Sequence, residues 1–384
     1  MIENRIYLDN AATTPLDPTV IETMVEVMKE HYGNPSSTHG HGRKVKNLVE
    51  ESRSRIAKWL NCKPSEIFFT SGGTEADNLA LRGAAQQLGV DAIISSPIEH
   101  HAVTHTVEEI AQQKGIPLHW VNILENGHVD MEHLAVLLQS CEKPLVSLMH
   151  ANNEIGNMID IQRVGDLVHQ HNGIFHCDTV QTMGHFSFDL STDSVDFICA
   201  AAHKFNGPKG VGFLYVNKKH RIPAEITGGS QEREMRGGTE NVYGIVGMTK
   251  ALEICYAQLD KKRSQIQALK DHMMSELIKY IPGIEFNGDP NGNSLYTVLS
   301  VSFPANDAGS MLLFNLDIAG ISASGGSACS SGSTKGSHVI NAIRPNTDRT
   351  TVRFSFGKFN TIAEIDNVVE KLKELYGQNA VTAQ

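Results

Sequence analysis

Residues 200–216 read AAAHKFNGPKGVGFLYV, and this stretch is the strongest local indication of the fold. A hydrophobic strand is expected to end at residues 200–202, after which come His203, Lys204 and a glycine-rich turn into a second strand. The small residues around Lys204 leave room for a bulky group against its amine. A lysine at a strand end suits a Schiff base, which needs an unprotonated and partly desolvated amine.

Short apolar runs alternate with helical patterns on the N-terminal side of this stretch. The runs expected to be strands are 67–70, 92–95, 118–121, 145–149, 174–178 and 195–200. Helices are expected from Pro18, after residue 40, from Thr74 and near His101. Continuous apolar strands that alternate with helices predict an α/β fold with a mostly parallel sheet covered on both faces.

The C-terminal part of the chain has a different pattern. A long helical pattern runs from about residue 240 to 281 and is expected to break and to connect two domains. Strands are expected at 297–303 and 351–356, and Thr361 and Glu364 form a capping box for a last helix. We therefore predict a large domain at 15–260 and a small α/β domain made of 1–14 and 261–384.

Composition excludes several classes of partner. The chain has 384 residues, 40% of them hydrophobic, and a net charge of −10, which argues against nucleic acid or an anionic membrane as the main partner. No apolar run is long enough to span a bilayer, and the N-terminus has no signal-peptide pattern. The six cysteines have no pairwise or metal-type spacing, so we expect a protein of the reducing cytoplasm.

Three further strand ends carry polar groups that suit one cofactor. In TSGGTEADN (70–78), Gly73 and Thr74 lie between a strand and a helix, where bare amides and the helix dipole can hold a phosphate. In HCDTVQT (176–182), Asp178 ends an apolar strand and can keep a pyridine nitrogen protonated. In HANNEIG (150–156), side-chain amides follow another strand. Because strand ends of an open parallel sheet meet in one crevice, these groups and Lys204 together predict a pyridoxal phosphate site.

Histidines follow the strand at 92–95. His100 is placed to stack on a cofactor ring or to move a proton. His101 and His105 are spaced like a metal-binding pair on a helix, but no carboxylate or thiol with matching spacing supports a metal site. We therefore predict that the chain binds no metal.

A serine- and glycine-rich stretch, SASGGSACSSGSTKGS (322–337), carries Cys329 at its centre. It contains no large apolar side chain and no helical or strand period, so we expect a mobile loop. An exposed thiol on such a loop is unlike the other cysteines, which we expect to be buried. From the residues alone the site suits a pyridoxal phosphate transaminase, and that reading leaves Cys329 without a role.

A series of segments resembles, in order, those of the cysteine desulfurases, the NifS/IscS type of the class V pyridoxal phosphate aminotransferases. The segments are YLDNAATTP, GNPSSTHGHGR, FTSGGTEADN, EHHAV, HANNEIGN, CDTVQT, AAHKFNGPKGVG, GGSQEREMRGGTENV, GGSACSSGS and RFSFGKF. The resemblance implies the pyridoxal phosphate-dependent transferase fold type I, with a mostly parallel sheet of the seven-stranded type in the large, cofactor-binding domain. It also implies an enzyme that takes sulfur from L-cysteine, releases L-alanine and holds a persulfide on Cys329.

The resemblance also implies roles for single residues. Lys204 becomes the lysine that bonds to the cofactor, Asp178 the partner of the ring nitrogen, and His100 the ring-stacking acid–base residue. Gly73, Thr74 and His203 are implied to contact the cofactor phosphate, and Gln181 the ring hydroxyl. Asn153 and Arg353 are implied to bind the substrate carboxylate. Thr239 is implied to reach the phosphate of the cofactor bound to a partner subunit. These roles imply a homodimer with shared sites and a sulfur acceptor, for example in iron–sulfur cluster assembly or tRNA thiolation.

Two departures from the family pattern are visible. Ala201 stands where many relatives have a serine that contacts the phosphate, so one hydrogen bond is expected to be missing. The chain also stops soon after its last helix, where relatives carry a longer tail that docks an iron–sulfur scaffold, so this mode of docking is in doubt. Two alternative functions stay open: a selenocysteine lyase, and an inactive relative that serves as a binding partner.

Overall fold

A seven-stranded sheet forms the centre of the structure, a computed structural model that describes residues 5–305, 309–325 and 336–377. The strand order is β2-β8-β7-β6-β5-β3-β4; β8 is antiparallel to both of its neighbours, and all other pairs are parallel. The bounds are β2 Ile67–Thr70, β3 Ala92–Ser95, β4 Leu118–Trp120, β5 Pro144–Ser147, β6 Ile174–Asp178, β7 Phe197–Ala201 and β8 Gly212–Val216. The predicted mostly parallel α/β sheet is confirmed.

Alternate residues along the central strands pack into hydrophobic clusters on opposite faces of the sheet, which together form the first core. In β6 and β7, Ile174, Phe197 and Cys199 pack on one side, while Phe175 and Ile198 pack on the other. This follows from the two-residue period of a strand, and it explains why these strands are apolar throughout. Helices α3 (Gly73–Gln87) and α4 (His101–Lys114) cover the first face.

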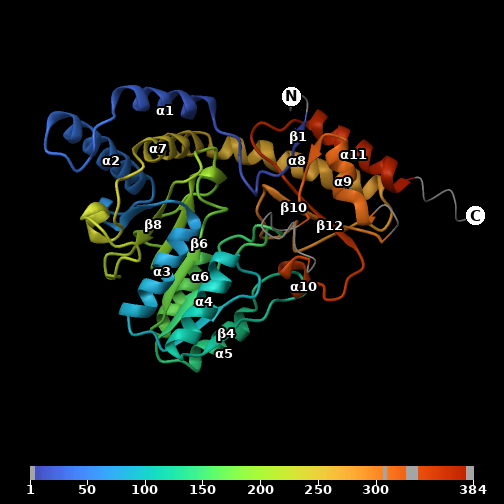
Figure 1. Cartoon of the computed structure of the whole chain (residues 1–384). Coiled ribbons are helices and arrows are strands. Elements are labelled where there is room, and N and C mark those ends of the chain that lie inside the picture. The colour runs from blue at the N-terminus through green and yellow to red at the C-terminus, as the bar shows by residue number, and fades with distance from the viewer. Residues whose placement is uncertain (1–4, 306–308, 326–335, 378–384) are drawn as a thin grey trace, which may run out of the picture.

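The other core cluster of the sheet contains five helices, of which α1 packs on the outer side of α7 (Figure 1). These are α1 Pro18–Glu30, α2 Gly40–Trp59, α5 Met131–Gln139, α6 Ile161–Gln170 and α7 Val242–Ala257. The predicted start of α1 is confirmed, because Asp17 is its N-cap and accepts a hydrogen bond from Thr19 N at 2.8 Å, with Pro18 as the first helical residue.

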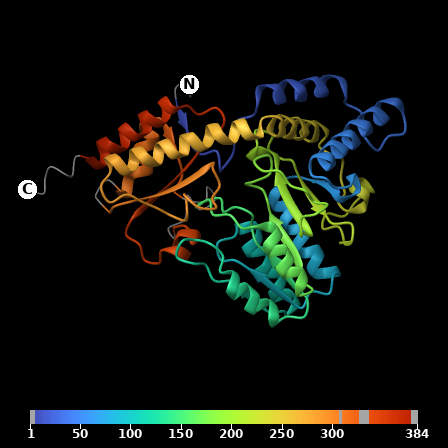
Figure 2. The same cartoon turned by 180° about the vertical axis from the view of Figure 1, so that it is seen from behind.

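A second core lies beyond the end of the large sheet. The long helical pattern breaks at Gln258, and α8 (Leu259–Tyr280) runs from the first core toward the second, beside α11 (Ile362–Gly377) (Figures 1 and 2). The second core contains an antiparallel sheet in the order β12-β10-β9. The remaining bounds are β1 Ile6–Tyr7, β9 Glu285–Phe286, β10 Val298–Phe303, β11 Ile321–Ser322, β12 Thr350–Ser355, α9 Leu312–Ile318 and α10 His338–Ile343.

The capping box of the last helix has formed as predicted. Thr361 N donates to the Glu364 carboxylate at 2.8 Å, and Glu364 N donates to Thr361 Oγ1 at 3.3 Å. The domain bounds at 14/15 and 260/261 stay a prediction. The two cores contain different segments of the chain, and the partly buried Phe186 packs against both.

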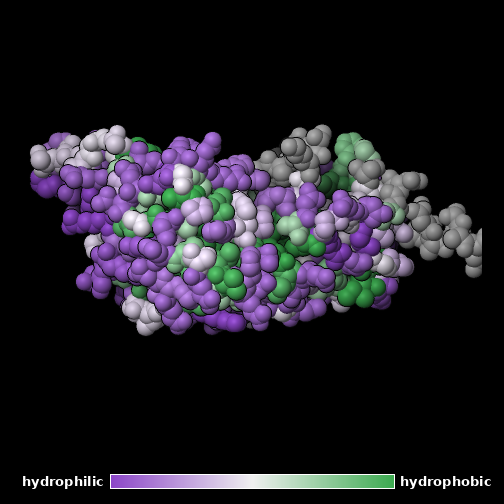
Figure 3. Space-filling model, turned by 90° about the horizontal axis from the view of Figure 1, so that it is seen from below, coloured by the Kyte–Doolittle hydropathy of each residue, from purple (hydrophilic) through white to green (hydrophobic). Residues whose placement is uncertain are grey.

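The surface shows no single large apolar face in the view from below, where hydrophobic patches are scattered among hydrophilic residues (Figure 3). None of the helices that the structure describes combines the length and the hydropathy needed to cross a membrane.

A buried ion pair anchors the segment between β8 and α7. Glu232, Arg233 and Glu234 all have positive φ angles, a backbone conformation that is costly for residues other than glycine. Arg53 of α2 binds the Glu232 carboxylate through two nitrogens, at 2.7 and 2.8 Å, and both side chains are almost fully buried. Phe69 N donates to the same carboxylate at 2.8 Å. The pair therefore holds a strained segment against β2.

We expect Glu232→Gln to lower the free energy of unfolding by about 3–5 kcal/mol, because it leaves the Arg53 charge buried without its partner. The matched control is Glu253→Gln, which breaks the partly exposed pair between Arg55 of α2 and Glu253 of α7. This second change should cost less than about 1 kcal/mol. Urea denaturation followed by circular dichroism measures both, and equal effects would contradict the expectation.

Candidate functional site

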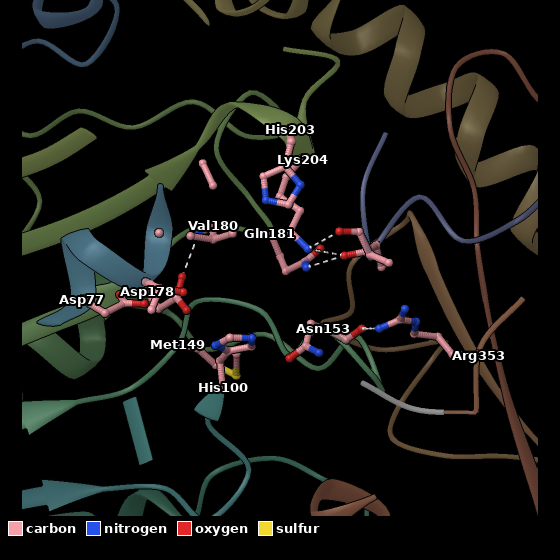
Figure 4. Close-up of a pocket in the computed structure, with 15 residues that line it drawn as sticks. Asp77, His100, Met149, Asn153, Asp178, Val180, Gln181, His203, Lys204 and Arg353 are labelled. Atoms are coloured by element: carbon pink, nitrogen blue, oxygen red, sulfur yellow. Dashed lines mark hydrogen bonds between the residues drawn. The ribbon is translucent and has the colours of Figure 1, made fainter. Parts of the chain in front are cut away.

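A pocket opens at the carboxyl ends of the parallel strands (Figure 4). Most of the predicted site residues line it, although they come from distant parts of the chain. The lining consists of Ala11, Ala12, Gly73, Thr74, Asp77, His100, Met149, Asn153, Asp178, Val180, Gln181, Ala201, His203, Lys204 and Arg353. The structure thus brings together the strand-end groups that the sequence analysis placed in one crevice.

Lys204 extends into the pocket from a short 3-10 turn, Ala202–Lys204, that follows β7. Its Nζ donates to the carbonyl oxygens of Ala11 and Ala12, at 2.6 and 2.9 Å. Gln181 Nε2 donates to the same Ala11 oxygen at 3.0 Å. The segment that leads into α1 therefore forms one wall of the pocket and holds the lysine amine.

Asp178 lies at the end of β6 and is buried. Its Oδ1 accepts a hydrogen bond from Val180 N at 2.8 Å. Burial, followed by the charge of Asp77, raises the pKa of Asp178 to about 7. A carboxylate in this position is available to a cationic group within the pocket.

The N-terminus of α3 borders the pocket. Gly72 is its N-cap and Gly73 its first residue, where a Cβ atom would lie 2.6 Å from Cγ2 of Val180. Only glycine fits this close approach, and it leaves backbone N–H groups bare at the positive end of the helix dipole. Thr74 and His203 line the same pocket, and burial, then the Lys204 charge, lowers the pKa of His203 to about 4.

His100 is both a pocket residue and the N-cap of α4. Its Nδ1 accepts a hydrogen bond from Ala102 N at 3.1 Å, so in the neutral imidazole the proton is on Nε2. Burial and then the nearby Lys204 charge lower the pKa of His100 to about 4. The ring is consequently neutral at physiological pH, with Nε2–H as its donor.

Arg353 enters the pocket from β12, in the second core, and is 1% exposed. One terminal nitrogen donates to the Asn153 carbonyl at 2.9 Å and the other to Asp9 Oδ1 at 2.7 Å, while Nε has no hydrogen-bond partner among the described residues. These contacts fix the guanidinium plane. A planar, fixed guanidinium at a pocket wall is suited to bind a carboxylate.

Two predicted site residues are not among the described residues that line this pocket. Thr239 lines a second pocket together with Gly238, Glu240 and Arg236, and is not in the wall of the first. Cys329 lies outside the described residues.

The described residues on both sides of the Cys329 segment are anchored close to the first pocket. Ser324 pairs with Arg353, with Ser324 N to Arg353 O at 3.3 Å and Arg353 N to Ser324 O at 2.6 Å. Ser337 is the N-cap of α10, and its hydroxyl donates to Glu154 at 2.5 Å, next to Asn153. The described chain therefore ends before the Cys329 segment, and resumes after it, at residues that adjoin the pocket.

Several residues in or beside the pocket had no role assigned from the sequence. Asp9, Ala11 and Ala12 belong to the segment YLDNAATTP, and their polar contacts to Lys204 and Arg353 span more than 190 positions of the chain. Asp77, in TSGGTEADN, also had no role assigned. Its position in the first turns of a helix that follows a glycine-rich, phosphate-binding type of turn was the sequence feature that could have pointed to it.

Comparison with known proteins identifies the family. The model of the class-V aminotransferases matches residues 6–368. The chain belongs to the class-V aminotransferase family. It is 40% identical over 381 residues to a protein of Dictyoglomus turgidum named cysteine desulfurase IscS, with 97% of this chain and 95% of the relative covered.

Solved structures of the family agree with the fold. A structure described as a NifS-like protein superposes with a TM-score of 0.89 at 37% identity and covers 97% of this chain and all of its own. A structure described as SspA in complex with cysteine superposes with a TM-score of 0.79 at 28% identity, covering 93% of this chain and 100% of its own. The pyridoxal phosphate-dependent fold type I predicted from the resemblance is confirmed.

We expect His100 to titrate with a midpoint near pH 4, well below the 6.5 of an ordinary histidine, because its protonated form is disfavoured by burial and by Lys204. Nuclear magnetic resonance of ¹⁵N-histidine-labelled protein measures the midpoint and the tautomer, and His100→Gln assigns the signal. A midpoint near 6.5, or a proton on Nδ1, would be at odds with the geometry.

Proposed function

We propose that this chain is a pyridoxal phosphate-dependent cysteine desulfurase that takes sulfur from L-cysteine, forms L-alanine and holds the sulfur as a persulfide on Cys329. The observation that carries the proposal is one pocket that contains Lys204 and Asp178. The described residues that precede and follow the Cys329 segment, Ser324 and Ser337, are anchored beside this pocket. Family membership and relatives named cysteine desulfurase support it.

The pocket residues fit the cofactor. The close glycine at Gly73 and the N-terminus of α3 suit the phosphate, with Thr74 and His203 beside them. Ala201 adds no side-chain donor there, as the sequence indicated. Asp178 suits the ring nitrogen and Gln181 the ring hydroxyl.

When bound, pyridoxal phosphate supplies an electron sink that weakens the Cα–H bond of an attached amino acid. Lys204 would hold the cofactor, and its amine, which the Ala11 and Ala12 carbonyls align, is placed to take the Cα proton. The Asp178 carboxylate would keep the ring nitrogen protonated. The neutral His100 would orient the ring through Nε2–H and exchange protons with the substrate.

Sulfur transfer needs no external oxidant. The Cys329 thiolate attacks the sulfur of the substrate, and the Cβ–S bond breaks with its electron pair left on Cβ. Protonation of Cβ and return of the proton from Lys204 to Cα then give alanine, and both sulfur atoms remain joined as a persulfide on the chain. Because the thiolate is the attacking species, the rate depends on the ionisation of Cys329.

The substrate carboxylate is the natural ligand of the Arg353 guanidinium. Asp9 and the Asn153 carbonyl hold Arg353 from two sides, and Asn153 lines the pocket with its own side chain. Cysteine and selenocysteine have the same carboxylate and amine. Relative rates on the two amino acids therefore separate a desulfurase from a selenocysteine lyase.

We also propose a homodimer in the cytoplasm that passes sulfur to an acceptor protein. Helix α1 leaves Ile21, Val25 and Met28 exposed at helical spacing, and Tyr32, just beyond its end, is exposed too, a face suited to a partner. Thr239 in its separate pocket is available to the phosphate of a second copy. The five described cysteines are free thiols, as a reducing compartment requires.

We expect single-turnover reaction with L-cysteine, without reductant, to release one alanine per active site and to add one sulfur to Cys329, as mass spectrometry of the alkylated protein will show. Lys204→Ala should slow alanine release at least about 100-fold, because it removes the general base. Cys329→Ser should keep cofactor binding but lose the added sulfur. Alanine formed at the normal rate by Cys329→Ser would overturn the role of this thiol.

Asp9→Asn tests the carboxylate site. It removes the charged partner that orients Arg353, so KM for L-cysteine should rise about tenfold while kcat stays within about threefold. Asp17→Asn, which removes a carboxylate of the same segment that binds Lys358 outside the pocket, is the control. Steady-state alanine production gives both constants, and an unchanged KM for Asp9→Asn would exclude this orienting role.

A further inference from the structure

Two neighbouring threonines of the N-terminal segment contact His203 in different ways. Thr14 binds the backbone, since its N–H and its hydroxyl donate to the His203 carbonyl oxygen at 2.8 and 2.9 Å. Thr13 contacts the side chain, since its Oγ1 lies 3.2 Å from His203 Nδ1. The proposed mechanism uses neither threonine.

The backbone on both sides of the Thr13 side chain is held in place. Tyr7 Oη donates to Thr13 O at 2.8 Å, and Thr13 N donates to Asp9 O at 3.4 Å. Within the described parts of the chain, His203 Nδ1 is the only hydrogen-bond partner of the Thr13 hydroxyl. The fold therefore dedicates this hydroxyl to a ring 190 positions away.

The His203 ring has a single N–H to place. Burial, followed by the charges of Lys204 and Lys209, lowers the pKa of His203 to about 4, so the ring is neutral near pH 7. In a neutral imidazole one nitrogen donates and the other accepts, and the hydrogen bond of one nitrogen decides the role of the other. Nδ1 faces Thr13, whereas Nε2 makes no hydrogen bond among the described residues, and the ring lines the pocket.

The phosphate end of the proposed site has few side-chain donors. Thr74 and His203 line the pocket together with Gly73, while Ala201 in the same wall brings no polar side chain. Phosphate oxygens are strong hydrogen-bond acceptors, so a ring nitrogen that binds them must carry a proton. An Nε2 without a proton would present a lone pair and would leave His203 without a bond to the phosphate.

We propose that Thr13 is a positioning residue for the cofactor phosphate, because its hydroxyl donates to His203 Nδ1 and thereby keeps the ring proton on Nε2 as a donor to the phosphate. This inference rests on the proposed function. A hydroxyl suits the task because it can donate, whereas a carbonyl oxygen next to Nδ1 would only accept and would draw the proton away from Nε2. Preference for a phosphorylated cofactor thus depends on a residue that is not among the described residues lining the pocket.

Binding of pyridoxal phosphate and of pyridoxal, which lacks the phosphate, tests the proposal. Thr13→Val keeps the shape of the side chain and removes the hydroxyl. The dissociation constant of pyridoxal phosphate should therefore rise about tenfold, while that of pyridoxal should stay within about threefold. Thr13→Ser keeps a hydroxyl and should bind both within about threefold of the wild type. Absorption titration of the full chain freed of cofactor measures both constants.

Thr14→Val is the matched control. It removes the hydroxyl that donates to the His203 carbonyl and accepts from Asn206 N at 2.7 Å, so it disturbs the whole turn. We expect it to change the two dissociation constants by the same factor. An equal change of both constants in Thr13→Val, without selectivity for the phosphate, would overturn the proposal.

A double variant shows whether Thr13 acts through the imidazole. In a protein that carries His203→Ala, the further change Thr13→Val should alter the dissociation constant of pyridoxal phosphate less than about twofold, because the group that Thr13 positions is gone. A second tenfold loss in the double variant would contradict a role through His203.

Nuclear magnetic resonance of the ¹⁵N-histidine-labelled holoenzyme locates the ring proton, and His203→Gln assigns the signal. We expect a proton on Nε2 and none on Nδ1 in the wild type, and a mixture of the two neutral forms in Thr13→Val. A proton on Nδ1 of the wild-type ring would be incompatible with donation by Thr13. If the wild type bound neither pyridoxal phosphate nor pyridoxal, the proposed function would fall. The same spectrum of the protein alone would still decide whether Thr13 donates to His203.

Discussion

The hydrogen bonds from Lys204 to the carbonyl oxygens of Ala11 and Ala12 are the contact on which the rest of the site depends. The same N-terminal segment joins the second core a few residues earlier, where Ser355 N donates to Leu8 O at 2.7 Å. A single short stretch of backbone thus connects both cores and forms a wall of the pocket. Peptide carbonyls align the amine without adding a net charge, so they hold the lysine while leaving it free to react.

Burial gives the other groups of the pocket their properties. It disfavours the charged form of every ionisable group, which keeps His100 neutral and raises the pKa of Asp77, Glu99 and Asp178. Local donors and cations oppose this effect of burial. At Asp178 a backbone N–H from Val180 and the Lys204 charge lower the pKa that burial raises. Such an arrangement costs folding free energy and supplies a preorganised electrostatic environment for chemistry.

Prediction from the sequence succeeded where local patterns control structure. The apolar runs that became β2, β3 and β6 match the observed strands residue for residue, because strands packed on both faces leave a continuous hydrophobic signal. The pocket residues at strand ends were found for the same reason. The partners of Arg353 and Lys204 were missed, because a contact between Asp9 and a residue 344 positions away leaves no local pattern. The raised pKa of the Asp77 carboxyl was missed too, since burial by neighbouring elements causes it.

By itself, the sequence determined the α/β class, the sheet and its covered faces, and the identity of the strand-end groups. These features follow from periodicity, turn residues and small side chains within short windows of the chain. Only the tertiary structure decided which groups meet, which carbonyls hold Lys204, and which partners hold Arg353. Those outcomes depend on distances between remote segments and on exclusion of water, and both arise only when the two cores pack together.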